Sequence, residues 1–130
     1  MKKVSFFLVV IAGSMLLNSC SKDVGGNVFI RVQNKSSKPV ADLTVFSWSS
    51  EGTNQIEVGY GSVLAENTTQ YRRHEITYNY PLLKFTMQGL PPVDLRDIRC
   101  GNGLFEIKEG RYTYVITEEN SNVSVHIVKD

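Results

Sequence analysis

The chain has 130 residues, with 14 basic and 13 acidic side chains, two histidines and two cysteines. The near balance of charge removes an electrostatic reason to expect binding to nucleic acid or to an anionic membrane surface. The length allows one domain with an ordinary hydrophobic core and excludes a second domain of similar size.

The first 19 residues differ in composition from the rest of the chain. A basic start, Met1-Lys2-Lys3, precedes an apolar run from Val4 to Leu17. This run is too short to cross a bilayer of about 30 Å as a helix, and it fits the hydrophobic region of a secretory signal peptide. The alternative is a buried N-terminal helix, which the basic start and the absence of acidic residues before Asp23 disfavour.

The apolar run ends in Leu17-Asn18-Ser19-Cys20. This tetrapeptide resembles the lipobox of bacterial lipoproteins, although Asn18 stands where that family usually has a small residue. The resemblance implies that residues 1–19 are removed and that Cys20, whose thiolate is the nucleophile, is acylated. It also implies a lipid-anchored protein of the cell envelope. Ser21 after the cysteine implies the outer membrane, at its periplasmic face or at the cell surface.

Removal of residues 1–19 leaves 111 residues with 12 basic and 13 acidic side chains. Residues 20–27 would then form the lipidated cysteine and a flexible tether, and residues 28–130 a single domain. If Cys20 is acylated, Cys100 is the only remaining thiol, so an intramolecular disulfide is excluded. We expect Cys100 to be a small buried hydrophobic residue. An intermolecular disulfide and a catalytic thiol are the alternatives.

The remaining chain consists of short β-rich runs separated by turn residues, without a helical period. The runs are 28–33, 40–48, 56–60, 68–78, 82–87, 95–100, 104–108, 112–117 and 123–128. We expect seven to eight short strands from them and therefore an all-β fold, a single antiparallel β-sandwich. Gly101-Asn102-Gly103 predicts a tight hairpin. Pro91-Pro92 predicts a loop or a sheet edge, because proline cannot donate to a sheet ladder.

One run predicts which side chains face the core. In 40–48, Leu43 and Val45 lie on one face, and Phe46 and Trp48 lie on the other. We expect Phe46 and Trp48 to point inward, because large aromatic side chains contribute most to core packing.

Gly110-Arg111-Tyr112 resembles the start of the penultimate strand in immunoglobulin-like domains, where a tyrosine hydrogen-bonds back across the loop. The same pattern before a terminal hairpin occurs in transthyretin-like sandwiches. Tyr114 stands where antibody domains have a cysteine. The chain as a whole is similar to the small sandwich lipoproteins of Bacteroidota. The resemblance implies an immunoglobulin-like or transthyretin-like sandwich, with a tyrosine corner at Tyr112 and a positive φ at Gly110.

The sequence offers little for catalysis or metal binding. His74 and His126 are isolated, and we expect each to lie on a solvated strand face. The acidic residues fit ordinary charges at loop and strand ends better than the paired carboxylates of a glycosidase. These residues are Asp94, Asp97, Glu106 and Glu109. No nucleophile elbow, phosphate loop or zinc-protease motif is present. We therefore predict no catalytic residue, no metal and no cofactor.

Aromatic residues are the remaining candidates for a binding site. Tyr78 and Tyr80 lie at the end of run 68–78, where Pro81 should turn the chain out of the sheet. Tyr71 shares its side of the strand with polar residues, so we expect it to be half-buried. We predict that Tyr78 or Tyr80 contributes to a binding surface together with Tyr71, with Arg72 or Arg73 as a polar neighbour. Core packing of the tyrosines is the alternative.

The sequence thus predicts a membrane-anchored envelope lipoprotein that is not an enzyme. Its β-sandwich would bind a protein or a glycan partner and no nucleic acid. A structural component of an envelope or surface assembly is the alternative, and a small hydrolase is a third reading.

Overall fold

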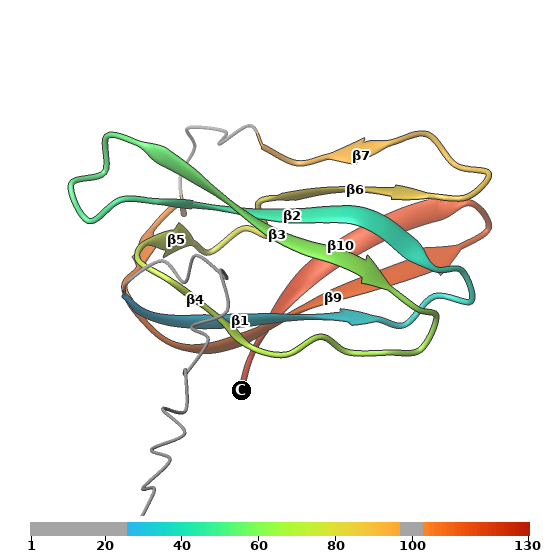
Figure 1. Cartoon of the computed structure of the whole chain (residues 1–130), viewed down its shortest axis with the longest axis horizontal. Helices are drawn as coiled ribbons and strands as arrows, with labels where there is room; N and C mark the ends of the chain where they lie inside the picture. The colour runs from blue at the N-terminus through green and yellow to red at the C-terminus, as the bar shows by residue number, and fades with distance from the viewer. Residues whose placement is uncertain (1–25, 97–102) are drawn as a thin grey trace, which may run out of the picture.

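A computed structural model describes residues 26–96 and 103–130, and within these ranges ten strands form three sheets (Figure 1). Sheet A has the order β10-β9-β1-β4, with β1 (Asn27–Asn34), β4 (Arg72–His74), β9 (Glu109–Glu119) and β10 (Asn122–Lys129). Sheet B has the order β3-β2-β6-β7, with β2 (Val40–Trp48), β3 (Gln55–Val63), β6 (Leu83–Met87) and β7 (Val93–Asp94). Sheet C pairs β5 (Thr77–Tyr78) with β8 (Glu106–Ile107).

The predicted all-β sandwich is confirmed, because the two large sheets bury their inner faces against each other. In β1 the alternate residues Val28, Ile30 and Val32 are each 0% exposed, as the sequence pattern requires. They share one apolar cluster with side chains of sheet B such as Val45 and Leu83. The described chain has more strands than the seven to eight expected, because β5, β7 and β8 are pairs of residues.

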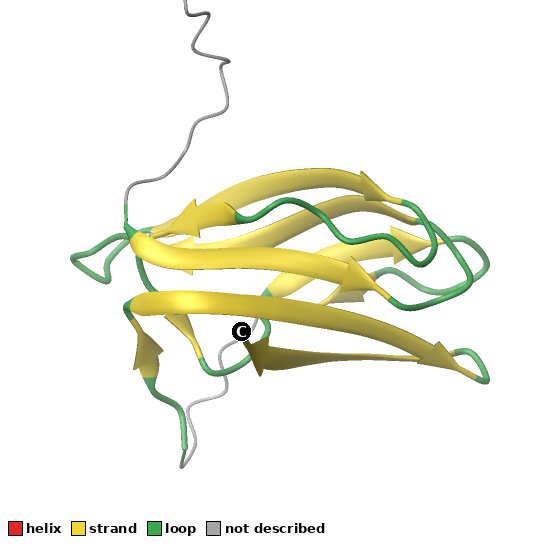
Figure 2. Cartoon of the chain, turned by 90° about the horizontal axis from the view of Figure 1, so that it is seen from below, coloured by secondary structure: helices red, strands yellow, loops and turns green. Residues whose placement is uncertain are grey.

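The strands run along the domain, and the loops gather at its two ends (Figure 2). We call these the Asn27 end, where the first described strand begins, and the Asn120 end, where β9 turns into β10. The two residues of that turn, Asn120 and Ser121, have φ of 52° and 66°. Positive φ at both central residues is the requirement of a tight type I′ hairpin. The predicted hairpin of 112–117 with 123–128 is therefore confirmed.

β1 is a central strand with an unusual partner. It pairs parallel with β9 on one side and antiparallel with β4 on the other. Every other strand pair in the described ranges is antiparallel. In immunoglobulin constant-type domains the first two strands share a sheet. Here β1 and β2 lie in different sheets.

A β-bulge in β2 sets which of its side chains enter the core. The register shifts between Val40 and Leu43, and Asp42 has a φ of 52°, which aspartate tolerates better than most residues. The extra residue lets Val40 and Leu43 both join the apolar cluster although they are three positions apart. Strict alternation from Val40 would have turned Leu43 to the surface.

The predicted single strand 68–78 is wrong. His74 pairs with Val28 in sheet A, whereas Ile76 bridges to Trp48 of sheet B. The chain therefore changes sheets between His74 and Ile76, and one continuous strand cannot pair with both. The predicted hairpin around Gly101-Asn102-Gly103 lies largely outside the described residues, as do Cys100 and Asp97.

The predicted inward orientation of Phe46 and Trp48 needs correction. Phe46 is fully buried but is not part of the apolar cluster that contains its neighbour Val45, so it packs on the other side of sheet B. The cationic groups of Lys84 and Arg96 lie 5.8 and 5.7 Å from the centre of its ring and cover it. Trp48 is only half-buried. Basic side chains thus bury an aromatic ring that sequence patterning assigns to the core.

The start of β9 confirms the glycine but not the tyrosine corner in full. Gly110 has a φ of 111°, and a Cβ there would lie 3.1 Å from the Tyr112 ring. The Tyr112 hydroxyl donates to the Glu109 carbonyl at 3.4 Å, a long bond within the same strand and near the surface. The buried hydroxyl is instead that of Tyr114, 3.1 Å from the Thr77 hydroxyl.

This difference gives a matched pair of substitutions. Tyr114→Phe should lower the free energy of unfolding by about 1 kcal/mol, because it leaves the Thr77 hydroxyl buried without its partner. Tyr112→Phe should cost less than half as much, since its bond is long and accessible to water. Denaturant unfolding of both variants provides the comparison. Equal losses would contradict the assignment of the buried role to Tyr114.

Candidate binding surfaces

The five residues that the sequence singled out for binding lie in three different surroundings. Tyr78 packs edge-to-face on Trp48, with ring centres 5.1 Å apart, and Tyr80 is 51% exposed near the Asn27 end. Tyr71 and Arg73 contact aromatic and cationic groups on sheet A, and Arg72 contacts Tyr60 of sheet B. The expected half-burial of Tyr71 is confirmed. The contacts of Arg72 and Arg73 are thus with residues other than Tyr78 and Tyr80.

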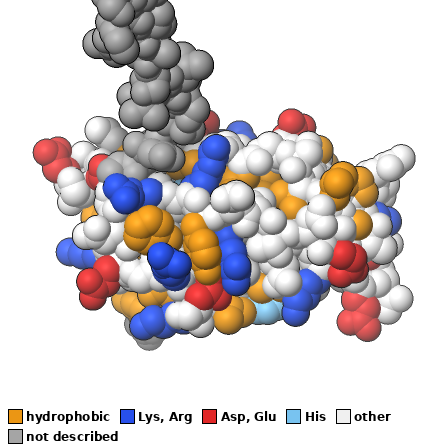
Figure 3. All heavy atoms as spheres, turned by 60° about the horizontal axis from the view of Figure 1, so that its bottom comes forward, with side chains coloured by type: hydrophobic (Ala, Val, Ile, Leu, Met, Phe, Trp, Pro, Cys, Tyr) orange, Lys and Arg blue, Asp and Glu red, His pale blue; other side chains and the backbone are white. Residues whose placement is uncertain are grey.

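The outer face of sheet A presents guanidinium groups and aromatic rings in alternation. We call this the arginine–aromatic ladder, and its members in spatial order are Arg73, Phe29, Arg111, Tyr71 and Arg31. The four successive guanidinium carbon-to-ring-centre distances are 5.3, 5.6, 5.3 and 4.8 Å. The view from this side shows basic side chains gathered among hydrophobic ones (Figure 3).

The ladder follows from strand alternation and register. Since Val28, Ile30 and Val32 point inward, Phe29 and Arg31 point outward from β1. Phe29 lies directly opposite Arg73 on β4 and Arg111 on β9, so the three side chains form one row across the sheet. Such cross-strand neighbours are close enough for a long arginine to reach the ring.

A carboxylate lies at one end of the ladder. The Asp130 carboxylate accepts hydrogen bonds from the Tyr71 hydroxyl at 2.6 Å and from the Thr113 hydroxyl at 2.7 and 2.9 Å. Its oxygen is also 3.8 Å from Nε of Arg31. Desolvation raises the pKa of Asp130, but the hydrogen bonds from Tyr71 and Thr113 together with the charges of Arg31 and Arg111 outweigh it, and the pKa is lowered. The hydrogen bond to Asp130 raises the pKa of the Tyr71 hydroxyl.

A second cluster lies at the edge of the sandwich, between β3 and β4. His74 was expected on a solvated face, but it is 0% exposed, because its register partner is the inward-facing Val28. The His74 ring stacks on the Tyr60 ring. The Arg72 guanidinium group also lies over the Tyr60 ring, and it donates to the Gly59 carbonyl. His126 lies exposed on β10, as expected.

The hydrogen bonds of this cluster fix the tautomer of His74. The Tyr60 hydroxyl donates its one proton to the Ile30 carbonyl at 2.9 Å. Nε2 of His74, 2.8 Å away, must therefore donate to the Tyr60 oxygen. Nδ1 is then unprotonated, and it is buried without a hydrogen-bond partner among the described residues. Burial, with a smaller contribution from the charge of Arg72, lowers the pKa of His74 to about 4. Burial also raises the pKa of Tyr60, so both groups are neutral at pH 7.

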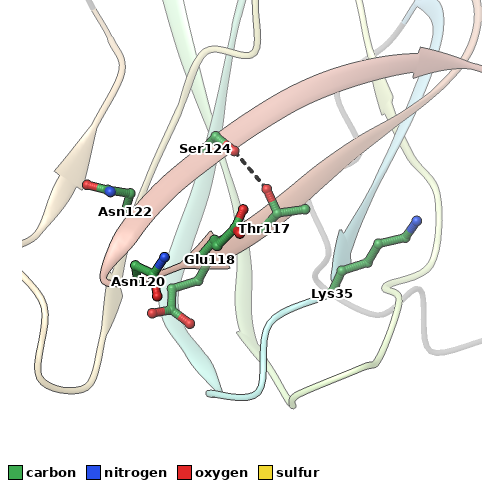
Figure 4. A pocket seen from close by; sticks show the side chains of 7 residues that line it. Lys35, Thr117, Glu118, Asn120, Asn122 and Ser124 are labelled. Atoms are coloured by element: carbon green, nitrogen blue, oxygen red, sulfur yellow. Dashed lines mark hydrogen bonds between the residues drawn. The ribbon is translucent and has the colours of Figure 1, made fainter.

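A polar cleft of about 660 Å³ lies at the Asn120 end, beside the β9–β10 hairpin (Figure 4). Its lining is formed by Lys35, Thr117, Glu118, Glu119, Asn120, Asn122 and Ser124. Two of these side chains satisfy each other, since the Thr117 and Ser124 hydroxyls are 2.7 Å apart. Glu118 accepts from the Ser121 amide at 3.0 Å. The cleft has no aromatic or aliphatic lining residue, so it lacks the hydrophobic side chains that usually line a small-molecule site.

The sequence missed Phe29, Arg31 and Arg111, although a signal was present. Phe29 and Arg31, like Tyr71 and Arg73, are an aromatic residue and an arginine two positions apart on an outward strand face. Alternation identifies such faces, but it does not say which strands are neighbours. The pairing of β1 with β4 and β9 brings these residues together.

Within residues 26–96 and 103–130, no group of three or more histidine, cysteine, aspartate or glutamate side chains is placed to hold a metal ion. The same part of the chain contains no helix long and apolar enough to cross a membrane. No family model matches the chain, and a comparison with curated proteins found no match.

Proposed function

We propose that this protein is a lipid-anchored, non-catalytic binding protein of the cell envelope, held at the outer membrane through Cys20. Its β-sandwich binds a protein or glycan partner through the outer face of sheet A. The fold itself is transthyretin-like rather than immunoglobulin-like in this proposal, because the first two strands lie in different sheets.

The observation that supports a binding role is the arginine–aromatic ladder. A guanidinium group that stacks on an aromatic ring keeps its in-plane N–H donors free for a ligand. Among the described residues, Arg73 and Arg111 have no carboxylate within 4.0 Å, and both side chains are exposed. The ladder thus supplies ordered donors on a flat, rigid sheet, which lowers the conformational cost of binding a partner.

The lipid anchor is tested by intact-mass analysis of protein purified from envelopes. We expect a mass that lacks residues 1–19 and includes acyl chains, and a Cys20→Ala variant that accumulates as unprocessed precursor. Normal maturation of Cys20→Ala, together with an unacylated wild type, would exclude the anchor.

The binding face is tested by saturable capture of envelope components on immobilised protein. Arg73→Gln/Arg111→Gln should lose capture and keep its melting temperature, because both side chains are exposed. Lys35→Gln/Lys38→Gln removes the same charge from the loop at the Asn120 end and should capture as the wild type does. Equal capture by all three proteins would rule out the outer face of sheet A as the binding surface.

A structural role in an envelope assembly is the second candidate. β10 is the eight-residue edge strand of sheet A, and no described strand pairs with its outer side. An unpaired edge of this length is a template for a strand from another chain. Concentration-dependent oligomers would favour assembly, whereas a monomer with saturable partner binding favours the first candidate.

A further inference from the structure

We propose that the arginine–aromatic ladder recognises oxyanions and that its ligand is an acidic glycan bearing carboxylate or sulfate groups. This inference rests on the proposed function of the outer face of sheet A and specifies the chemistry of its ligand. It is drawn from what the ladder already binds, from the guanidinium donors that form no ion pair and from the small number of large hydrophobic side chains exposed on this face.

The ladder already holds one oxyanion, which belongs to the chain itself. The Asp130 carboxylate lies against Arg31 and receives hydroxyl hydrogen bonds from Tyr71 and Thr113. These are charge-assisted and hydroxyl contacts of the kind that fix acidic sugars and carboxylates generally. The side chain of Asp130 is 21% exposed, so the contact lies at the surface and is open to extension across the sheet.

The next row of the ladder has guanidinium donors that form no ion pair within 4.0 Å in the described part of the chain. Arg73 and Arg111 lie on strands at either side of β1, and both guanidinium groups are within 5.6 Å of the Phe29 ring centre. Neither forms an ion pair with a carboxylate in the described part of the chain. A planar guanidinium group held against the Phe29 ring can bind an oxyanion through two parallel N–H donors. The flexible ammonium group of lysine cannot reproduce this geometry.

The composition of this face favours a glycan over a protein. Protein interfaces depend on apolar and aromatic anchors that become fully buried in the partner. The large hydrophobic residues exposed in the described chain are Leu64, Tyr80, Leu95, Phe105 and Val128, and only Val128 lies in sheet A. The rings of Phe29 and Tyr71 are already covered by guanidinium groups. The ladder therefore offers mainly charge and hydrogen bonds, with Val128, the register partner of Thr113, as the one large exposed hydrophobic side chain beside it, which suits a hydrophilic polyanion.

The experiment measures binding of polygalacturonate to the purified, full-length mature protein in a nonionic detergent, by isothermal titration calorimetry. Dextran serves as the neutral glycan. We expect saturable binding of polygalacturonate that weakens as salt is added, and no binding of dextran. Arg73→Gln/Arg111→Gln should weaken binding at least about tenfold. Lys35→Gln/Lys38→Gln should stay within about twofold of the wild type, because its charges lie at the other end of the domain.

A second variant tests whether the ligand is recognised by the planar guanidinium groups or by positive charge alone. Its result can be interpreted without that of the glutamine variant. Arg73→Lys/Arg111→Lys keeps the net charge and the long aliphatic stems, so it should fold, and it should still bind several-fold more weakly than the wild type. Binding equal to that of the wild type would overturn recognition by stacked guanidinium groups. The melting temperature of each variant is measured as a control. A melting temperature equal to that of the wild type shows that weaker binding comes from lost contacts with the ligand and not from unfolding.

Three results would overturn the inference itself. They are absence of polygalacturonate binding, tighter binding of polyglutamate than of polygalacturonate, and binding of vesicles rich in phosphatidylglycerol in preference to both. The second result would assign the face to an acidic protein and the third to a membrane surface. If any of them occurs while Arg73→Gln/Arg111→Gln still abolishes capture of envelope components, the proposed binding face stands and only the glycan assignment fails.

Discussion

Replacing Asn34 by alanine should lower the free energy of unfolding by about 3 kcal/mol. Its side chain is 0% exposed. Its amide nitrogen donates to the carbonyls of Lys38, Val63 and Leu64 at 2.8, 3.2 and 3.3 Å. Its oxygen accepts from the amide and the hydroxyl of Ser36 at 3.0 and 2.6 Å. Alanine removes all of these bonds at once. The Leu64 carbonyl keeps its bond from the Asn67 amide and the Lys38 carbonyl keeps its bond from the Ser36 hydroxyl, but the buried Ser36 amide loses its acceptor.

Denaturant unfolding measures this loss. Two further variants test whether the loss comes from the buried side-chain amide. Asn54→Ala changes an exposed loop asparagine and should stay within about 0.5 kcal/mol of the wild type. Asn34→Asp keeps the acceptor for Ser36 but places a carboxylate against carbonyl oxygens, so it should not restore stability. A loss below about 1 kcal/mol for Asn34→Ala would show that water replaces the amide and that Asn34 does not organise these loops.

The second large effect is a loss of stability in mild acid caused by His74. The pKa of this group falls from 6.5 in the unfolded chain to about 4 in the folded one, mainly through burial and secondarily through Arg72. Between these values the unfolded state binds more protons, so stability rises with pH. The contribution of His74 is fully present above pH 6.5, declines as the pH falls towards 4, and amounts to about 3 kcal/mol in total.

The measurement is the free energy of unfolding at a series of pH values from 7.5 to about 4.5, a window above most carboxylate pKa values. His74→Phe keeps a ring of similar shape and cannot bind a proton, so its stability should change little across this window. His126→Asn removes the exposed histidine and should keep the slope of the wild type. A wild-type stability that is flat from pH 6.5 to 4.5 would contradict the buried, neutral His74.

Alternation and turn residues predict the long strands and the β9–β10 hairpin, because both depend on neighbours in sequence. They fail where the partner of a residue lies elsewhere in the fold. The change of sheets after His74 and the burial of His74 itself depend on contacts with Val28 and Trp48. Asn34 lies just beyond the predicted run 28–33, and its burial depends on the β3–β4 connection folding over it.

The candidate site also depends on partners that lie elsewhere in the fold. Sequence reasoning predicted that Tyr71 and Arg73 lie near Tyr78 and Tyr80, whereas the structure places them beside Phe29, Arg31 and Arg111. The overall balance of charge argued against an electrostatic surface, yet Arg31, Arg73 and Arg111 are brought to one face by strand pairing. Net charge is a property of composition, whereas local charge is a property of register, and only the second decides what a sheet face can bind.

The parallel pairing of β1 with β9 has a consequence for how the domain forms. The paired residues Arg31 and Thr113 are 82 residues apart in the sequence. Non-local strand pairs of this kind place a sandwich among the slow folders, in milliseconds to seconds, because the chain between them must close before the pair contributes any stability. A chain that crosses a membrane N-terminus first would present the apolar strand β1 long before β9 arrives. During that interval β1 is an aggregation-prone segment with unpaired edges that requires protection from self-association. Deletion of the last twenty residues would leave β1 without its main pairing partner, β9.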